Sequence, residues 1–347
     1  MRIPLDATST LPITYHNVAE IEPEPAGLTL QRVPAVWRAR WPEQTAFRAT
    51  QAGGVELRFY ARTHHVGLEL TAETQMGYTA ALALYHGRRN VGLATLTTPR
   101  FDGVVTLIER DDDFDGMAEQ PWRILCPYGA RTTVCALHLS EGVALLPLPT
   151  LAAPRPVRWL AHGDSITHGA HALHPGYTYV NLVADALGWD ALNLGFGGSA
   201  WGDAAVAEYI AARDDWDVLS LAIGTNTYGG AKESAADYRQ RYARFLEIIR
   251  AAHPTKPVVC VTPFWRAADG PPAVPNRYGD PPQAYRDAIA AAVSAHQAND
   301  HHLVLVDGLE IVGDDRGLTV DRLHPDPHGM GRIAQHLAPI LARTLAS

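Results

Sequence analysis

Apolar and polar positions alternate with a period of two from about residue 45 to residue 148. This alternation is typical of strands that bury one face and expose the other. Strand candidates separated by Gly, Asp and Asn turn signals are found at 55–62, 66–71, 79–85, 91–97, 103–108, 122–126, 132–138 and 142–148. Many short strands without a convincing helical period predict an antiparallel all-β sandwich.

Beyond residue 156 the pattern changes, because short apolar runs now alternate with segments of helical period. We expect strands at 157–161, 191–195, 218–223, 257–262 and 303–307, and helices at 179–188, 204–213, 235–252, 283–298 and 329–346. Such alternation predicts a parallel sheet covered by helices on both faces. Two prolines make residues 151–156 a stiff linker. The predicted domains are therefore an N-terminal β-sandwich at 1–153 and an α/β domain at 154–347.

Composition and charge indicate which kinds of binding partner to expect. The chain has 347 residues, 47% of them hydrophobic, which is enough for two cores. Its net charge of −8 and the lack of any Lys/Arg run argue against nucleic acid or an anionic membrane as a partner and favour a small-molecule substrate. No apolar stretch has the length of a spanning helix or the form of a signal peptide. We expect a cytoplasmic protein, with export left open if the sequence is trimmed.

A serine at the end of the first apolar run is the main candidate for chemistry. Residues 157–161 lead into the turn Gly163-Asp164-Ser165, which can present the Ser165 hydroxyl as a nucleophile. A serine hydroxyl needs a base, usually histidine, and that histidine needs a group that fixes its tautomer. His324 and Asp321, three residues apart before the last helix, fit these two roles.

The oxyanion formed by such an attack needs hydrogen-bond donors already in place. Three are available: the backbone N–H of Ser165, the backbone N–H of Gly198 and the side-chain amide of Asn226. Each of these residues follows a predicted parallel strand. Because reactive groups collect at the carboxyl ends of such strands, we expect the three to meet at one edge of the sheet.

Ser165, Gly198, Asn226 and His324, in this order, resemble the four sequence blocks of the SGNH, or GDSL-type, hydrolase family over about residues 157–347. The resemblance implies a three-layer, flavodoxin-like domain. It also implies that Ser165 is the nucleophile of an acyl-enzyme, Asp321 and His324 the acid and base, and Gly198 and Asn226 oxyanion donors. The sequence departs from the pattern at Ile166, where Leu is usual, and at Thr227, where an Asp that braces the asparagine loop is usual.

Residues 193–200 and 227–230 are similar to those of two-domain actinobacterial members with an N-terminal β-sandwich of jelly-roll or carbohydrate-binding type. That subgroup includes esterases and an acyltransferase acting on an aromatic polyketide antibiotic. Two-domain carbohydrate acetylesterases share the layout. The catalytic residues would be the same for hydrolysis and for acyl transfer, so the resemblance does not separate the two.

Other side chains near the expected site are candidates for binding. His168, His171 and His174 recur every three residues, but Gly169 and Pro175 favour a loop that cannot hold one rigid metal-binding face, so we expect no metal there. The residues expected to contact substrate are His168, Trp201, Tyr228, Trp265 and Arg266. The expected chemistry requires neither a metal nor an organic cofactor.

These patterns favour a serine esterase acting on a short-chain or O-acetyl ester. One alternative is an acyltransferase that moves the acyl group to a hydroxyl of a small natural product or sugar. Another is a glycan- or partner-binding protein with an inactive hydrolase domain. Trp37 and Trp41 fit a stacking platform for glycans or a place in a core or domain interface. For the sandwich itself, we expect a role as one wall of the active-site cleft.

Overall fold

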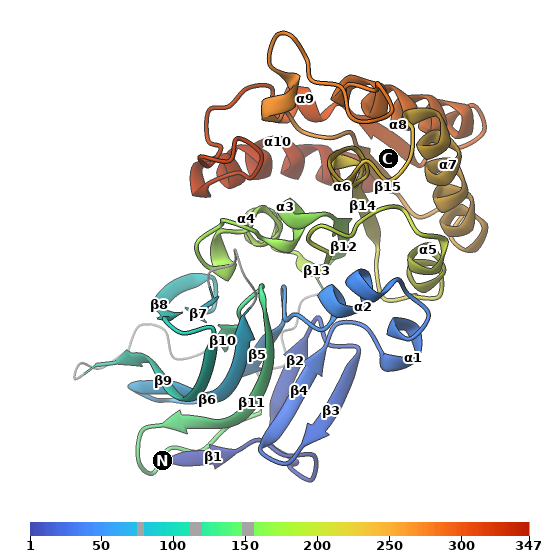
Figure 1. Cartoon of the computed structure of the whole chain (residues 1–347). Helices are drawn as coiled ribbons and strands as arrows, with labels where there is room; N and C mark the ends of the chain where they lie inside the picture. Colours follow the sequence, from blue (N-terminus) through green and yellow to red (C-terminus); the bar gives the residue numbers. More distant parts are fainter. Residues whose placement is uncertain (75–79, 111–119, 148–155, 347) are drawn as a thin grey trace. The chain divides into compact units, whose positions relative to one another are not determined.

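The computed structural model describes residues 1–74, 80–110, 120–147 and 156–346. It divides into two compact units (Figure 1). The first comprises Met1–Ala35, Ala49–Arg155 and Leu173–Gly176, and the second comprises Val36–Arg48, Pro156–Ala172 and Tyr177–Ser347. The predicted boundary between residues 153 and 154, and most of the proline linker, lie outside the described residues.

Two antiparallel sheets form the first unit, as the two-residue period predicts. One contains β1 (Arg2–Pro4), β3 (Glu20–Glu24), β4 (Gly27–Gln31), β11 (Ala130–Leu139), β6 (His65–Thr74) and β9 (Arg100–Glu109). The other contains β2 (Ile13–His16), β5 (Glu56–Phe59), β10 (Trp122–Leu125), β7 (Ala80–His86) and β8 (Arg89–Leu96). Leu57, Leu68 and Leu82, from both sheets, are fully buried in one apolar core.

The structure corrects the strand prediction in two places. It adds the four N-terminal strands β1 to β4, which have weak apolar patterns. β3 carries Pro23 and lies at the end of its sheet, where a residue without an N–H is tolerated. In contrast, residues 142–147 form no strand, and Leu146 makes only an isolated bridge with Tyr60. The following Pro147 cannot donate a ladder hydrogen bond, which explains why pairing stops there.

Five parallel strands form the sheet of the second unit, in the order β13-β12-β14-β15-β16. Their bounds are β12 (Arg158–Gly163), β13 (Asp190–Gly195), β14 (Val218–Ala222), β15 (Val258–Val261) and β16 (Leu303–Val306). This is the flavodoxin-like order 2-1-3-4-5, and it confirms the predicted α/β domain. The order places the carboxyl ends of β13, β12 and β14 side by side, so the loops that follow these three strands share one edge.

Helices cover both faces of this sheet (Figure 1). α4 (Tyr179–Leu187) packs with α10 (Pro327–Ala346), whereas α7 (Ala235–Ala252) packs with both α5 (Ala204–Ala211) and α8 (Pro282–Gln297). Shorter helices follow four of the strands: α3 (Ser165–His168), α6 (Thr225–Gly230), η2 (Ala267–Asp269) and α9 (Gly308–Ile311). A further short helix, η1 (Pro175–Tyr177), lies between α3 and α4. Within the described ranges, no helix is long and apolar enough to cross a membrane.

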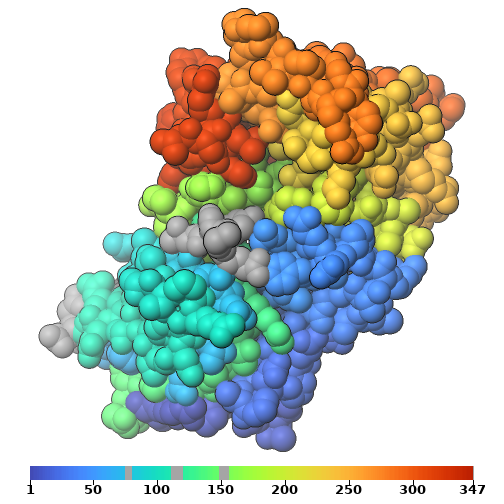
Figure 2. Space-filling view, in the orientation of Figure 1, coloured from blue at the N-terminus to red at the C-terminus, as the bar shows by residue number. Residues whose placement is uncertain are grey.

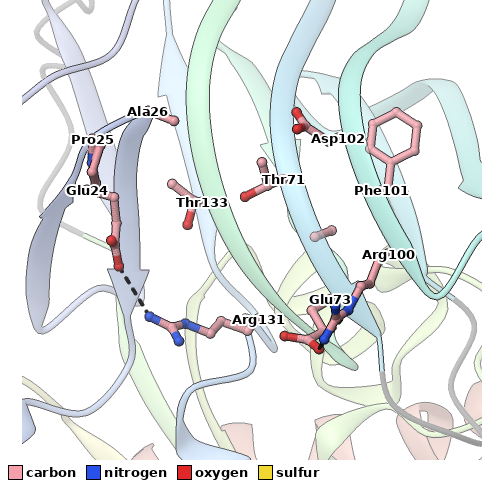
Figure 3. A pocket seen from close by; sticks show the side chains of 11 residues that line it. Glu24, Pro25, Ala26, Thr71, Glu73, Arg100, Phe101, Asp102, Arg131 and Thr133 are labelled. Carbon is pink, nitrogen blue, oxygen red and sulfur yellow. Dashed lines mark hydrogen bonds and ion pairs between the residues drawn. The ribbon is translucent and has the colours of Figure 1, made fainter.

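A groove of about 560 Å³ lies on the first unit over β6, β9 and β11 (Figure 3). Its lining includes no serine or histidine. Arg131 pairs with Glu24 at 3.2 Å and Arg100 with Glu73 at 2.9 Å, so four of its charged side chains neutralise one another. We assign this groove no part in the chemistry described below.

Candidate active site

Ser165 is the first residue of α3, directly after β12. The Asp164 side chain caps this short helix by accepting a hydrogen bond from the Ile166 N–H at 2.9 Å. The cap fixes the sharp turn from strand to helix and places the Ser165 N–H among the free donors of a helix N-terminus. No acceptor for this N–H is found within the part of the chain that the structure describes.

A relay of three side chains runs from Ser165 to Asp321. The Ser165 Oγ lies 2.7 Å from Nε2 of His324, and Nδ1 of His324 lies 2.7 Å from Oδ2 of Asp321. The second carboxylate oxygen of Asp321 accepts hydrogen bonds from Thr319 Oγ1 and from the N–H groups of Leu323 and His324. These contacts hold the carboxylate in the orientation that fixes the histidine tautomer.

Hydrogen bonding also keeps Asp321 ionised. Partial burial acts to raise the pKa of this carboxyl group, but hydrogen bonds from His324 and its neighbours outweigh burial and hold the pKa well below its ordinary value. A carboxylate that remains charged at neutral pH can stabilise the imidazolium that forms when His324 takes the serine proton.

Gly198 lies in the loop between β13 and α5, with φ at +73°. This is the left-handed region that glycine adopts readily and most other residues avoid. The preceding Gly197 N–H donates to Nδ1 of the buried His168 at 3.3 Å, which ties the loop to α3. The loop therefore lies against the helix that begins with Ser165, and the Gly198 N–H has no acceptor in the described ranges.

Asn226 is the second residue of α6, directly after β14. Its Oδ1 accepts a hydrogen bond from the Ala200 N–H at 3.0 Å. Because the oxygen is engaged, the amide is oriented and its Nδ2 remains available to donate. The structure thus brings together a nucleophile, a base, an acid and three oxyanion donors that are separated by up to 159 residues between Ser165 and His324.

Arg266 braces the asparagine loop where Thr227 replaces the usual aspartate. The Arg266 Nη1 donates to the carbonyl oxygen of Thr225 at 3.2 Å, and its guanidinium lies 4.6 Å from the ring centre of Tyr228. Thr227 itself is fully buried. The guanidinium of Arg266, which follows β15 in the chain, therefore holds the backbone next to Asn226 in place.

His171 lies beside the relay. Its ring centre is 4.9 Å from that of His324, and its Nε2 is 3.8 Å from Oδ2 of Asp321. The ligand atoms of these three residues lie within 4.8 Å of one another. However, both ring nitrogens of His324 are already engaged by Ser165 and Asp321, so a metal bound here would disrupt the relay. We therefore assign His324 and Asp321 to the relay and not to a metal centre, with His171 lying beside them.

Residues from the N-terminal part of the chain also support the site, which sequence reasoning missed. Residues 36–48 belong to the second unit although they come early in the chain. They include most of two short helices, α1 (Ala35–Arg38) and α2 (Glu43–Ala49). Thr45 Oγ1 donates to the Ser199 carbonyl oxygen at 3.1 Å, and Trp41 Nε1 donates to that of Ala205, also at 3.1 Å. In Figure 2, blue atoms of the early part of the sequence adjoin yellow-green atoms, the colour of α5.

A helical signal for this segment is present in the sequence. Trp37, Trp41 and Thr45 are spaced four residues apart, as on one face of a helix. Trp41 is buried and packs edge-on against Phe196 at 5.5 Å between ring centres. Trp41 thus takes the core role left open above, whereas Trp37 is only half-buried and contacts the ring of Tyr209, at 5.5 Å between ring centres.

Comparison with known families agrees with this geometry. A model of the GDSL-like lipase/acylhydrolase family matches residues 161–332, a stretch that contains the whole relay and all three oxyanion donors. This stretch belongs to the GDSL-like lipase/acylhydrolase family. No curated protein sequence matches the chain.

Several solved structures are similar over the length of the chain. Salicylyl-acyltransferase SsfX3 from a tetracycline biosynthetic pathway is 20% identical, with a TM-score of 0.83 and coverage of 99% of this chain and 97% of that one. A GDSL-like protein from Bacteroides ovatus is 20% identical, with a TM-score of 0.80 and coverage of 100% and 98%. A family two carbohydrate esterase from Cellvibrio japonicus is 15% identical, with a TM-score of 0.66 and coverage of 100% and 98%. At these identities the similarity shows the shared two-domain fold.

Two of the five residues expected to contact substrate, His168 and Tyr228, are buried and instead hold loops of the active site in place. His168 is fully buried under the Gly198 loop, so it cannot reach substrate as we expected. Tyr228 is 7% exposed, and its hydroxyl donates to the Val274 carbonyl oxygen at 2.7 Å. Each is a positioning residue, because its polar atoms hold loop backbone.

The other three expected contacts differ in what they touch. Arg266 holds the asparagine loop, as described above. Trp201 and Trp265 are partly exposed, and each ring is covered by a cation, Lys232 for Trp201 and Arg322 for Trp265. Contact of these two tryptophans with substrate stays a prediction.

Replacing Asn226 with alanine is expected to lower kcat by about 10²- to 10³-fold, because one preorganised oxyanion donor is lost. KM should change little, since the amide binds the oxyanion more strongly than the ground-state carbonyl. Steady-state kinetics of Asn226→Ala checks this, with Asn299→Ala, at an exposed asparagine in the turn after α8, as the matched control. An unchanged kcat would remove Asn226 from the oxyanion hole.

Replacing Thr45 with valine is expected to lower kcat roughly threefold to tenfold, the effect of one lost neutral hydrogen bond. The bond to the Ser199 carbonyl holds the residue next to Gly198, so its loss should loosen one oxyanion donor. Thr255→Val, at an exposed threonine of the same unit, is the control. A fall in thermal stability without any change in kcat would show that Thr45 has a structural role only.

Proposed function

We propose that this chain is a serine esterase that hydrolyses a short-chain or O-acetyl carboxylic ester through an acyl-enzyme on Ser165. The observation that carries the proposal is the continuous relay, with 2.7 Å from Ser165 Oγ to His324 Nε2 and 2.7 Å from His324 Nδ1 to Asp321 Oδ2. A relay of this geometry is ready to activate a serine without rearrangement. It therefore disfavours the alternative of a binding protein with an inactive hydrolase domain.

In the first half of the reaction, the Ser165 Oγ attacks the ester carbonyl while His324 Nε2 takes its proton. The oxyanion is bound by the N–H groups of Ser165 and Gly198 and by the Asn226 amide. His324 then protonates the leaving alcohol as the carbon–oxygen bond breaks, which leaves the acyl group on Ser165. In the second half, His324 removes a proton from water, the water attacks the acyl-enzyme, and the acid is released as Ser165 regains its proton.

Acyl transfer to another hydroxyl is the second candidate. The similarity to a salicylyl-acyltransferase, with the highest TM-score of the three structures described, supports it. In this reaction an acceptor hydroxyl replaces water in the second half, while the catalytic residues stay the same. Hydrolysis is our first choice because it requires no acceptor site beyond the groups described.

Two assays distinguish the candidates. Release of p-nitrophenol from acetate, butyrate and octanoate esters should be fastest for the shorter acyl chains and should depend on Ser165. Added alcohols should leave the yield of free acid largely unchanged if the protein is a hydrolase. Formation of the new ester at the expense of free acid would establish a transferase, and no release from any ester by the folded protein would contradict both.

Location and partners follow as further proposals. We propose a cytoplasmic protein that acts on a small-molecule ester, with a sugar or natural product as the possible acyl acceptor. The net charge of −8 supports a partner other than nucleic acid or an anionic membrane.

A further inference from the structure

Residues 36–48 make several contacts with the region around Gly198 in the second unit, which we call the GDSL-like unit. Besides the hydrogen bonds of Thr45 and Trp41, Arg40 forms an ion pair with Glu208 on α5. The Trp41 ring also packs against Tyr209, at 5.6 Å between ring centres. Several independent contacts therefore fix the start of α2 relative to the oxyanion loop.

Gln44, next to the anchor Thr45, reaches over Gly198. A Cβ atom placed on Gly198 would lie 3.2 Å from the Gln44 Nε2, the nearest heavy atom among the described residues other than the two chain neighbours of Gly198. The side chain of Gln44 is exposed, and it makes no hydrogen bond to any residue in the described ranges. Its amide thus lies beside an oxyanion donor, with its donor and its acceptor unused within the described ranges.

The chemistry of α2 indicates what this amide could bind. A neutral amide donates and accepts, which suits a hydroxyl group better than a charged or purely apolar group. Phe47 lies three residues further along, on the same side of the helix, and is 40% exposed. An exposed ring beside a free amide is a combination that recognises hydroxyl-bearing organic groups.

We propose that Gln44 is a specificity residue that hydrogen-bonds a hydroxyl of the ester's alcohol part while the ester carbonyl occupies the oxyanion hole. The alcohol part is the side that carries the hydroxyl because the proposed acyl group is short. This inference rests on the proposed esterase function. It assigns to the N-terminal segment a direct contact with substrate in addition to its support of the loop.

The test compares two acetates of six-carbon primary alcohols, methyl 6-O-acetyl-α-glucoside and hexyl acetate, which has no free hydroxyl. Gln44→Ala should raise KM for the glucoside roughly threefold to tenfold, with kcat within about twofold. For hexyl acetate, kcat/KM should change by no more than about twofold. Gln44→Glu, which keeps the acceptor and loses the donor, should fall between wild type and Gln44→Ala. Gln240→Ala, an exposed glutamine on α7, is the matched control.

Equal losses on both acetates, or a loss in kcat alone, would overturn the proposal and place Gln44 in support of the oxyanion loop. No change on either ester would also overturn it. A binding measurement separates this inference from the esterase proposal: calorimetry of the glucoside with the full-length Ser165→Ala protein, with and without Gln44→Ala. If wild type turns over no ester, a threefold to tenfold weaker affinity on removing Gln44 would still support the contact, and an unchanged or undetectable affinity would overturn it.

Discussion

Ser165→Ala is expected to lower kcat by about 10⁶-fold, the size of loss seen when the nucleophile of a serine hydrolase is removed. The substitution deletes only the Oγ atom, which lies 2.7 Å from its hydrogen-bond partner, His324 Nε2. The remaining oxyanion donors can still polarise a carbonyl, so a small residual rate above that in water should persist. The fold should be unaffected, because the Asp164 cap of α3 uses the backbone of Ile166 and not the serine side chain.

The measurement is the rate of p-nitrophenol release by matched preparations of wild type, Ser165→Ala and Ser294→Ala. Ser294 is exposed on α8, and its replacement should leave the rate unchanged. Intact-mass analysis during turnover adds a direct check, since the wild type should gain the mass of the acyl group and Ser165→Ala should not. Activity of Ser165→Ala close to that of wild type would disprove the nucleophile assignment.

Asp321→Asn is expected to lower kcat by about 10³- to 10⁴-fold while leaving KM within a few-fold of wild type. An asparagine can still accept the hydrogen bonds of Thr319 and Leu323 through its oxygen. Its amide N–H groups, however, then face His324 Nδ1, which must become the acceptor. The ring proton moves to Nε2, the nitrogen that faces Ser165, and that nitrogen can no longer take the serine proton.

Steady-state kinetics of Asp321→Asn and of the exposed control Asp287→Asn tests this expectation. The tautomer itself can be observed by nitrogen NMR of the His324 ring, which should show the proton on Nδ1 in wild type and on Nε2 in the variant. A variant that retains more than about a tenth of the wild-type kcat would show that His324 needs no orienting carboxylate, because the expected loss is at least a hundred times larger.

The predicted strands and helices of the GDSL-like unit agree with the structure to within a few residues. β13, predicted at 191–195, is observed at Asp190–Gly195, and α7 is observed at Ala235–Ala252 as predicted. Strands buried on both faces and helices with one apolar face produce strong local patterns, so their positions are readable without tertiary information. The same holds for Ser165, Gly198 and Asn226, because each follows such a strand.

Other features had no local pattern to reveal them. α3 and α6 are short, so neither shows a helical period. The Asp164 cap is a local contact two residues long, whereas the Arg266 brace on Thr225 joins residues 41 positions apart and forms only after folding. The burial of His168 and Tyr228 was missed for the same reason. Their polar side chains suggested contact with substrate, whereas each bonds loop backbone, that of Gly197 for His168 and that of Val274 for Tyr228.

The sequence by itself determined the two-part architecture, the strand ends that carry the chemistry and the identities of Ser165, Asp321 and His324. Only the tertiary structure decided that residues 36–48 join the GDSL-like unit and that Gln44 reaches over Gly198. The physical reason is the sequence separation of the residues that contact one another. Hydrophobic periodicity reports whether a residue is buried within its own element, but the partner that buries it is selected by packing between segments more than 150 residues apart, such as Thr45 and Ser199.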